Sequence, residues 1–475
     1  MLGVGSMNAA KIIPGMRKID HIHFIGIGGA GMCGIAEVLS NQGYKVSGSD
    51  LKPSANTDRL IDLGVIINFS HAEEHVHEAD VVVVSSAIDL HNPEITYAKQ
   101  NRIPVVARAE MLAELMRYRH GIAVAGTHGK TTTTSMIASI FSEAGLDPTF
   151  IIGGMVNNFG THARLGESRY LVVEADESDA SFLHLQPMAA VITNVEADHM
   201  ATYDGSMDKL KQTFYRFTNN LPFYGAVVVC IDDPVLKTMV SDLSRSVITY
   251  GFDSLADVQV TEVEQIGLTT QFIVKIEQQS FTLKINQPGI HNVLNATAAV
   301  ALSLDEGIDI ETIEKGLLRF QGVGRRFEVY GDYPLSGGQV TLVDDYGHHP
   351  SELAVTIDAL RASYPNRRVV MIFQPHRFSR TRDLYDDFVS VLAGVDILIL
   401  LDVYAAGEAP IAGADSRSLA HSLRVREEIE PIVVKKWNDV PSFLKKVVKA
   451  GDVVITQGAG NVNQLASLIS QVGFE

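Results

Sequence analysis

One run of residues constrains this chain more than any other: Gly-Thr-His-Gly-Lys-Thr-Thr-Thr at positions 126–133. It follows an apolar stretch, 122–125, that predicts a strand, and it precedes a segment with apolar residues at helical spacing. A strand, a glycine-rich turn and a helix N-terminus together aim backbone N–H groups and the positive end of a helix dipole at an anion. The run therefore predicts a phosphate-binding loop for a nucleoside triphosphate.

The residues of this loop are suited to different parts of the triphosphate. Lys130 supplies a positive charge, and Thr131 offers a hydroxyl to Mg²⁺. The loop is shorter than the usual G-x-x-x-x-G-K-[ST], because its first glycine is Gly126 and the usual position holds Val124. The residues predicted to bind the nucleotide here are Gly126, Thr127, His128, Gly129, Lys130, Thr131 and Thr132.

Length and composition limit the class of protein. At 475 residues the chain predicts three domains, from a prior of about 150 residues per domain. A net charge of −17 disfavours nucleic acid as a partner, and two cysteines, Cys33 and Cys230, favour a reducing compartment. The sequence has no run of about 18 apolar residues for a membrane span, and residues 1–18 resemble a flexible leader. We expect a cytoplasmic protein.

A repeated cycle of apolar strand, polar turn and helical pattern begins at residue 21 and predicts parallel α/β sheets. Strands are expected at 21–27, 44–49, 65–67, 79–85, 103–106, 122–125, 170–173, 189–194, 226–231, 339–343, 368–373, 396–401 and 452–456. Alternating residues between 256 and 286 predict an inserted β-ribbon. The expected architecture is a leader (1–18), a Rossmann-like domain (19–118), a central P-loop ATPase-type domain (119–324) and a C-terminal Rossmann-like domain (325–475).

A second glycine-rich turn follows the first predicted strand. Residues 26–32, Gly-Ile-Gly-Gly-Ala-Gly-Met, satisfy G-x-G-x-x-G, and Asp50 ends the next strand. Alone, this pattern indicates a nicotinamide dinucleotide, but any dinucleotide or UDP-sugar diphosphate fits the same turn. A dehydrogenase would not need a complete triphosphate loop one domain later, and the glycines could also serve helix packing alone. The nature of the ligand stays open at this point.

Two further strand ends carry groups suited to metal and phosphate chemistry. One strand delivers Glu174 beside the loop, where a carboxylate can hold Mg²⁺ across the phosphates. The next leads to His199 at the same edge of a parallel sheet. A lone histidine there is more often a surface residue, but its position relative to Lys130 and Glu174 favours function. The nearby carboxylates are expected to form a solvated turn: Glu177 and Asp179.

Four ordered stretches resemble the Mur ligases of peptidoglycan synthesis: G-T-H-G-K-T-T-T, E-A-D-E-S-D, T-N-V-E-A-D-H and H-N-V-L-N. The turn at 26–32 and the runs at 344–350 and 374–381 resemble the alanine-adding branch of this family, and the resemblance covers residues 18–470. It implies ligation of L-alanine to the carboxylate of UDP-N-acetylmuramate at the expense of ATP. An acyl phosphate would be the intermediate, and the products UDP-N-acetylmuramoyl-L-alanine, ADP and phosphate, in the cytoplasm of a bacterium.

The resemblance also implies roles for single residues. Lys130, Glu174 and His199 would be catalytic, and Thr131, Glu174 and His199 would bind Mg²⁺, with Mn²⁺ as its substitute. Beyond the loop, ATP would contact Asn292, Asn295, Arg326 and Asp345. The UDP-substrate would contact Gly28, Gly29, Ala30, Gly31, Met32, Asp50 and Ser85, and L-alanine would contact Tyr346, His348, His376, Arg377 and Arg380. The third domain is expected to close over bound ATP in a monomer or weak homodimer.

Some alternatives stay open. The two asparagines, Asn292 and Asn295, could instead cap a helix that starts at Ala296. Several relatives carry a carbamoylated lysine that bridges metal, whereas Phe214 falls near that place here, so we expect no carbamate. A recycling ligase that joins UDP-N-acetylmuramate to a murein tripeptide is the closest rival function. A P-loop switch or transport ATPase is the rival from another class.

Overall fold

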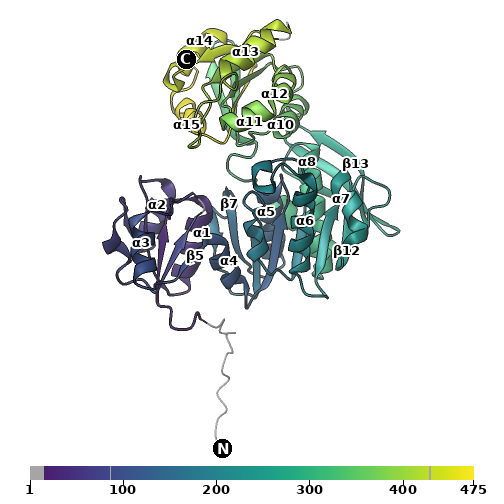
Figure 1. Ribbon diagram of the computed structural model, residues 1–475. Coiled ribbons are helices and arrows are strands. Elements are labelled where there is room, and N and C mark those ends of the chain that lie inside the picture. Colours follow the sequence, from purple (N-terminus) through teal and green to yellow (C-terminus); the bar gives the residue numbers. More distant parts are fainter. Residues whose placement is uncertain (1–14, 86, 427–428, 475) are drawn as a thin grey trace, which may run out of the picture. The chain divides into compact units, whose positions relative to one another are not determined.

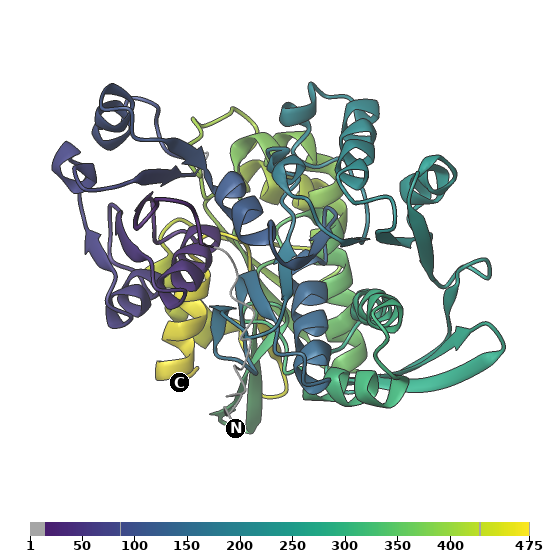
Figure 2. The same ribbon diagram turned by 90° about the horizontal axis from the view of Figure 1, so that it is seen from below.

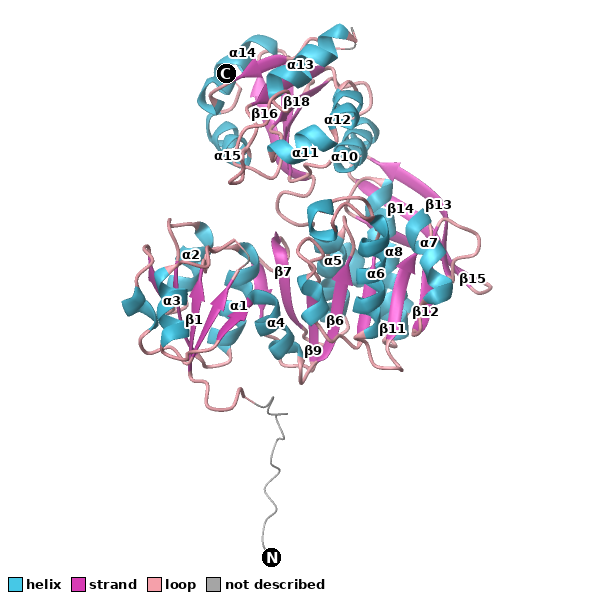
Figure 3. Cartoon of the chain, in the orientation of Figure 1, coloured by secondary structure: helices cyan, strands magenta, loops and turns pink. Residues whose placement is uncertain are grey.

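The computed structural model describes residues 15–85, 87–426 and 429–474, so residues 1–14 of the predicted leader lie outside the described residues. Within these residues the chain forms three sheets with flanking helices, which Figure 1 labels and Figure 3 colours by type. By compactness the chain divides into two units. Unit 1 comprises 1–153, 161–250 and 298–316, and unit 2 comprises 154–160, 251–297 and 317–475.

The first sheet, in unit 1, is parallel throughout, with strand order β3-β2-β1-β4-β5. Its strands are β1 (His21–Ile25), β2 (Lys45–Ser49), β3 (Ile66–Asn68), β4 (Val81–Val84) and β5 (Val105–Ala107). Its helices are α1 (Ala30–Asn41), α2 (Ala55–Asp62), α3 (Pro93–Gln100) and α4 (Arg108–Met116). The central strand β1 is buried along its whole length, as expected for a parallel strand covered by helices on both faces.

The strand that carries the predicted phosphate loop and its neighbours belong to the second sheet. They are β6 (His120–Ala125), β7 (Thr149–Val156), β8 (Thr161–Arg164), β9 (Tyr170–Glu174), β10 (Ala189–Ile192), β11 (Ala226–Cys230) and β12 (Ser246–Gly251). Strand β6 lies between β10 and β9 and is parallel to both. The carboxyl ends of these three strands therefore meet at one edge of the sheet. The helices here are α5 (Lys130–Glu143), α6 (Met207–Asn219) and α7 (Pro234–Met239).

Unit 2 contains the predicted β-ribbon, formed by β13 (Val258–Ile266), β14 (Thr269–Ile276) and β15 (Gln279–Ile285), which pair antiparallel. Figure 2 shows these strands as long arrows. Helices α8 (Ile290–Asp305) and α9 (Ile310–Arg319) follow and run from unit 2 into unit 1 and back. The ribbon prediction is thus confirmed at the level of its strands.

The last sheet, in unit 2, has strand order β16-β17-β21-β18-β19-β20. Its strands are β16 (Glu328–Leu335), β17 (Gly338–Asp345), β18 (Val369–Phe373), β19 (Ile397–Leu401), β20 (Ile432–Val434) and β21 (Val453–Gln457). Only β16 runs antiparallel among these strands of the described chain. Its helices are α10 (Pro350–Ser363), α11 (Phe378–Asp383), α12 (Tyr385–Leu392), α13 (Ser416–Val425), α14 (Val440–Val447) and α15 (Asn463–Val472).

The predicted three-domain α/β architecture is confirmed, whereas the predicted domain boundaries stay predictions. Several strands were not expected, among them β7, β8, β12, β16 and β20. All of these but β12 lie at or next to the edges of their sheets, where glycine, proline or polar residues interrupt the apolar pattern. In the described part of the chain, no helix is long and apolar enough to cross a membrane.

Candidate active site

The phosphate loop begins at the end of β6 and leads into α5. Gly126 has φ +131° and Gly129 has φ +81°, which favour glycine, and a Cβ atom at Gly126 would collide with the hydroxyl of Thr193. Gly129 is also the N-cap of α5, so the loop lies at the positive end of that helix. The local sequence therefore builds the anion-binding geometry that its glycines predict.

The end of β10 holds this loop in place. The backbone N–H of His128 donates to Asn194 Oδ1 at 2.8 Å, and the Thr193 hydroxyl donates to the His128 carbonyl. The Glu196 N–H donates to Thr127 Oγ1 at 2.9 Å. Sequence reasoning gave Thr193 and Asn194 no role, although a Thr-Asn pair directly after a buried strand beside the loop was a usable signal. These bonds fix the loop without help from a ligand.

Lys130, the predicted phosphate-binding cation, is paired with a carboxylate. Its Nζ donates to the carbonyl oxygens of Gly126 (2.6 Å) and Thr127 (3.0 Å) and to Glu177 Oε2 (2.8 Å). The side chains of Lys130 and Glu177 are only 17% and 6% exposed. The prediction that Glu177 lies in a solvated turn is therefore wrong: the chain turns it inward, because a buried ammonium needs a partner.

The electrostatics of this pair follow from burial. Burial raises the pKa of the Glu177 carboxyl, and the nearby Lys130 ammonium opposes that shift. Burial alone would lower the pKa of Lys130, but Glu177, Asp176 and Glu174 hold that pKa above its ordinary value. Lys130 therefore keeps its positive charge at the loop, which is the form that a polyphosphate requires.

Glu174 and His199 follow the two strands that flank β6. Glu174 is the last residue of β9 and pairs with Val124 of β6 in the sheet. Its Oε1 accepts from the Gly153 N–H at 2.8 Å. His199 precedes the short 3₁₀ helix η3 (Met200–Tyr203), has φ +52°, and its Nε2 lies 3.4 Å from Asp198 Oδ2. The structure thus brings both residues to the edge of the sheet where the loop lies.

The donor chemistry of the predicted metal ligands fits Mg²⁺ in part. Thr131 and Glu174 offer hydroxyl and carboxylate oxygens, the donors that Mg²⁺ prefers. The imidazole of His199 is a softer donor, which Mg²⁺ accepts less readily. Near the predicted place of a carbamoylated lysine, Phe214 is fully buried and packs edge-on against Phe182, with ring centroids 5.2 Å apart.

The second glycine-rich turn connects β1 to α1. Asp50 Oδ2 accepts from the Gly28 N–H at 2.9 Å, and Asn56 Nδ2 donates to the Gly28 carbonyl at 2.8 Å. A Cβ atom at Gly28 would lie 2.8 Å from Asp50 Oδ2, so glycine is required for this close approach. Asp50 thereby fixes the turn before it meets any ligand.

The remaining residues predicted for the UDP-substrate lie around this turn. Gly29 is the N-cap of α1, and Ala30 and Gly31 form its first residues. Met32 is 2% exposed, and its N–H donates to the Gly29 carbonyl at 2.9 Å. Ser85 follows β4, and its Oγ accepts from the Ala87 N–H at 3.3 Å.

The asparagines predicted to bind ATP lie inside a helix. Helix α8 begins at Ile290, so neither Asn292 nor Asn295 caps a helix that starts at Ala296, and that alternative is wrong. Asn292 Nδ2 donates to the Pro288 carbonyl at 2.8 Å, and Asn295 Nδ2 donates to Asn292 Oδ1 at 3.3 Å. Both side chains are buried, and the hydrogen bond between them ties them to each other.

Arg326 and Asp345 were also predicted to contact ATP. Asp345 is 7% exposed and accepts from the N–H groups of Phe327 (2.9 Å) and Gly347 (2.7 Å). Burial raises the pKa of this carboxyl, and Arg326 opposes the shift. The Arg326 guanidinium lies 5.0 Å from the Tyr346 ring centroid. Asp345 therefore organises the end of β17, and its contact with a ribose stays a prediction.

Four of the residues predicted to bind L-alanine form one contact chain in unit 2: Tyr346, His348, His376 and Arg380. The rings of Tyr346 and His348 meet edge-on with centroids 5.4 Å apart, and those of His348 and His376 lie 5.6 Å apart. Arg380 Nη1 lies 3.5 Å from His376 Nδ1, and the exposed Arg377 is the N-cap of α11. These side chains come from the carboxyl ends of β17 and β18, which the sequence could place only through the sheet.

The two histidines of this cluster, His348 and His376, are neutral at physiological pH. Burial lowers the pKa of His348 to about 3, with Arg380 and His376 adding to the shift and Glu352 opposing it. Burial lowers the pKa of His376 to about 4, helped by Arg380 and Arg377. A neutral imidazole can accept a proton, and the two guanidiniums can bind a carboxylate. The cluster is thus suited to an amino acid.

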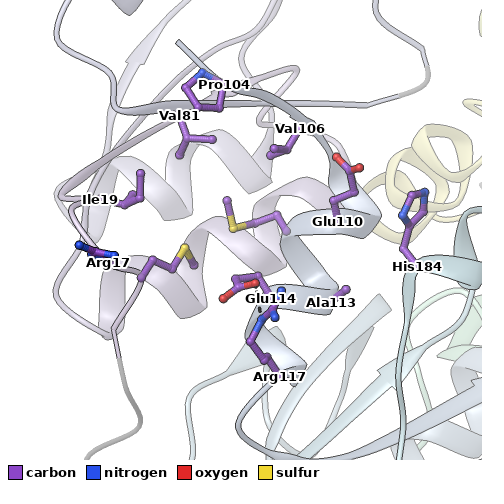
Figure 4. A pocket seen from close by; sticks show the side chains of 12 residues that line it. Arg17, Ile19, Val81, Pro104, Val106, Glu110, Ala113, Glu114, Arg117 and His184 are labelled. Atoms are coloured by element: carbon purple, nitrogen blue, oxygen red, sulfur yellow. Dashed lines mark hydrogen bonds and ion pairs between the residues drawn. The ribbon is translucent and has the colours of Figure 1, made fainter. Parts of the chain in front are cut away.

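A separate pocket of about 510 Å³ lies at the opposite edge of the first sheet (Figure 4). It is lined by Ile19, which precedes β1, by Val81 at the start of β4, and by Pro104 before β5. Helix α4 contributes Met111 among others. Since the glycine-rich turn follows the other end of β1, this pocket does not belong to the predicted UDP-substrate site.

Comparison with known proteins identifies the class. Three family models match consecutive parts of the chain: the Mur ligase family catalytic domain (21–120), the Mur ligase middle domain (124–303) and the Mur ligase glutamate ligase domain (325–460). The chain belongs to the Mur ligase family. Proteins of this family carry out ATP-dependent ligation in the synthesis of peptidoglycan precursors, with UDP-sugar, amino-acid and ATP substrates.

Solved structures agree with this assignment. UDP-N-acetylmuramate-alanine ligase MurC from Thermotoga maritima is 27% identical, with a TM-score of 0.82 over 95% of this chain and 98% of that chain. The murein peptide ligase of Psychrobacter arcticus is 24% identical, with a TM-score of 0.71 over 95% and 98%. UDP-N-acetylmuramate:L-alanyl-γ-D-glutamyl-meso-diaminopimelate ligase from Neisseria meningitides is 30% identical, with a TM-score of 0.60 over 65% and 100%.

Proposed function

We propose that this Mur ligase joins L-alanine to the carboxylate of UDP-N-acetylmuramate at the expense of ATP. The observation that carries the proposal is the cluster of two neutral histidines and two guanidiniums formed by His348, His376, Arg377 and Arg380. It offers a carboxylate-binding charge and a proton acceptor side by side. The likeness to the alanine ligase from Thermotoga maritima over 95% of the chain supports the same choice.

In the first step, a carboxylate oxygen of UDP-N-acetylmuramate attacks the γ-phosphorus of ATP, the bond to the bridging oxygen breaks, and ADP leaves. The carboxylate and the polyphosphate repel each other, so the reaction needs positive charge at the transferring oxygens. Lys130 supplies it at the loop once its contact with Glu177 is exchanged for phosphate. Mg²⁺, when bound by Thr131 and Glu174, would add charge neutralisation at the same phosphates.

In the second step, the amine of L-alanine attacks the carbonyl carbon of the acyl phosphate, and phosphate leaves from the tetrahedral intermediate. Arg377 and Arg380 bind the α-carboxylate of the amino acid, which fixes its amine nearby. The neutral His376 imidazole then takes the proton that the amine loses as the amide bond forms. Tyr346 borders the space for the methyl group.

The remaining assignments belong to the same proposal. The turn at Gly28 and Asp50, with Gly29, Ala30, Gly31, Met32 and Ser85, binds the UDP moiety through backbone N–H groups and the helix N-terminus. Asn292, Asn295, Arg326 and Asp345 contact ATP, and His199 would bind a second metal ion. The enzyme works in the cytoplasm, where its nucleotide substrates are made, as a monomer or weak homodimer.

ADP and phosphate release by the purified protein tests the proposal. ATP, Mg²⁺ and UDP-N-acetylmuramate are supplied, and L-alanine, L-glutamate and a murein tripeptide are added in separate reactions. Turnover that requires both UDP-N-acetylmuramate and L-alanine is expected. Turnover with tripeptide in place of L-alanine would assign the recycling reaction instead, and hydrolysis indifferent to UDP-N-acetylmuramate would assign an unrelated ATPase.

A further inference from the structure

Next to the acceptor cluster lies an aromatic side chain with no role so far. Tyr404 follows β19, and its ring stacks on the His376 ring with centroids 5.4 Å apart and planes 9° apart. The residue is 41% exposed, which is unusual for a large ring that only fills a core. A second ring, that of His348, also contacts the His376 ring, with centroids 5.6 Å apart. His376 is therefore flanked by Tyr404 and His348.

The backbone of Tyr404 also holds the loop that carries His376. The two residues form an isolated parallel bridge, in which the Tyr404 N–H donates to the Pro375 carbonyl and the Arg377 N–H donates to the Tyr404 carbonyl, each at 2.8 Å. Arg377 has φ +71°, a strained conformation for arginine. Such strain persists only where surrounding bonds enforce it, and the bridge to Tyr404 supplies two of them.

A third segment supports the ring from the end of β21. A Cβ atom at Gly460 would lie 2.9 Å from Tyr404 Cγ and would collide with Gln374 Oε1. Gln374 Nε2 donates to Asn461 Oδ1 at 2.9 Å, which ties this segment to the end of β18. The backbone at Gly460 can therefore approach Tyr404 only because it has no side chain.

We propose that Tyr404 is a positioning residue of the acceptor site, which keeps His376 oriented and shielded from water so that its neutral ring can take the amine proton. The inference rests on the proposed function, since it concerns the same proton transfer. Stacked aromatic rings contribute orientation as well as area burial. Removal of the Tyr404 ring would expose one face of the imidazole to water while leaving its charged neighbours in place.

The charges around His376 define the expected consequence. Arg380 in α11 and Arg377 at its N-cap oppose protonation of His376, and Glu408 favours it. The His348 ring faces His376 from the end of β17. Burial is the main cause that lowers the pKa of His376 from 6.5 to about 4. Hydration in a Tyr404→Ala variant relieves that cause, so the pKa rises toward its ordinary value. The imidazole then becomes protonated, and unable to act as a base, at a higher pH.

The test is the pH dependence of kcat/KM for L-alanine, expressed as the ratio of Tyr404→Ala to wild type so that titration of the substrate amine cancels. If the pKa returns to about 6.5, the ratio falls about tenfold between pH 8 and pH 5.5. Tyr404→Phe keeps the ring and should hold the ratio constant. Gly460→Ala keeps the tyrosine but displaces it, and should reproduce part of the fall.

The controls separate this role from simple destabilisation and from the proposed function. Each variant is referred to its own activity at pH 8, so a loss of folded protein does not change the ratio. Tyr118→Ala removes another tyrosine, 55% exposed, and should leave the ratio flat. A flat ratio for Tyr404→Ala, or an equal fall for Tyr404→Phe, overturns the role of Tyr404. A wild-type protein that fails to turn over L-alanine overturns the proposed function itself and the inference with it.

Discussion

The loop edge of unit 1 and the acceptor cluster of unit 2 handle charge in opposite ways. At the loop, the cation Lys130 is only 17% exposed and is paired with Glu177. In the acceptor cluster, burial keeps His348 and His376 neutral beside guanidiniums. The first arrangement preserves a charge for an anionic phosphate, and the second preserves a lone pair for a proton. The two edges are thus suited to the two successive half-reactions of the proposed ligation.

The largest effect is expected from removal of the loop cation. Lys130→Ala should lower kcat by about 10³-fold or more, because the charge that stabilises the transferring phosphoryl group is lost. ADP release in steady state measures it. Lys209→Ala, which removes a surface lysine paired with Asp204, is the matched control and should keep normal turnover. Activity of Lys130→Ala within tenfold of wild type would contradict the role of the loop cation.

Loss of the proposed base should separate the two half-reactions. His376→Ala should lower kcat/KM for L-alanine by about 10²-fold, since general base catalysis is removed. Formation of the acyl phosphate should persist, because that step belongs to the loop edge, and hydroxylamine trapping measures it. If acyl phosphate formation fell in parallel with ligation, the division of labour between the two edges would be wrong.

Breaking the buried ion pair should cost stability. Glu177→Ala leaves the Lys130 ammonium without its buried partner, and the free energy of unfolding should fall by about 3 kcal/mol. Denaturant unfolding measures this. Asp204→Ala breaks the exposed pair with Lys209 and should change stability by less than about 1 kcal/mol. Similar losses in the two variants would show that the Lys130–Glu177 pair is no more than a surface contact.

The last effect concerns unit 2 and appears only in acid. Burial lowers the pKa of His291 and His376 to about 4 and that of His348 to about 3, from 6.5. Below pH 6.5 the unfolded chain therefore binds protons that the folded chain excludes. Stability should fall as pH drops from 6.5 toward 4, by about 1.4 kcal/mol per pH unit for each histidine. His348→Gln should make this fall shallower in a pH series of unfolding curves, and an unchanged slope would contradict burial of a neutral imidazole.

The two edges also differ in how far the sequence predicts them. The loop is built from consecutive residues, so its strand, its glycines and Lys130 were all recognisable locally. The partner of Lys130 was not: Glu177 stands in a run with Glu174 and Asp176, and only the tertiary fold determines which carboxylate points inward. A run of acidic residues predicts a solvent-exposed turn, because charged residues are usually exposed.

The acceptor cluster illustrates the opposite case. Its residues were named through the resemblance to Mur ligases, whereas Tyr404 was missed, because it lies on another strand end and no local motif marks it. Helix α8 shows a related error, since it starts at Ile290, six residues before Ala296. Long-range contacts decide what local patterns leave open.

The buried ring of Phe214 has a consequence for how the enzyme would respond to its surroundings. A carbamate forms reversibly from dissolved CO₂ and an unprotonated lysine, so a ligase that depends on one is tied to the bicarbonate supply. A phenylalanine in a closed aromatic contact has no such equilibrium. The activity of this chain should therefore be the same in CO₂-depleted and bicarbonate-rich buffer, and should not depend on the concentration of dissolved CO₂.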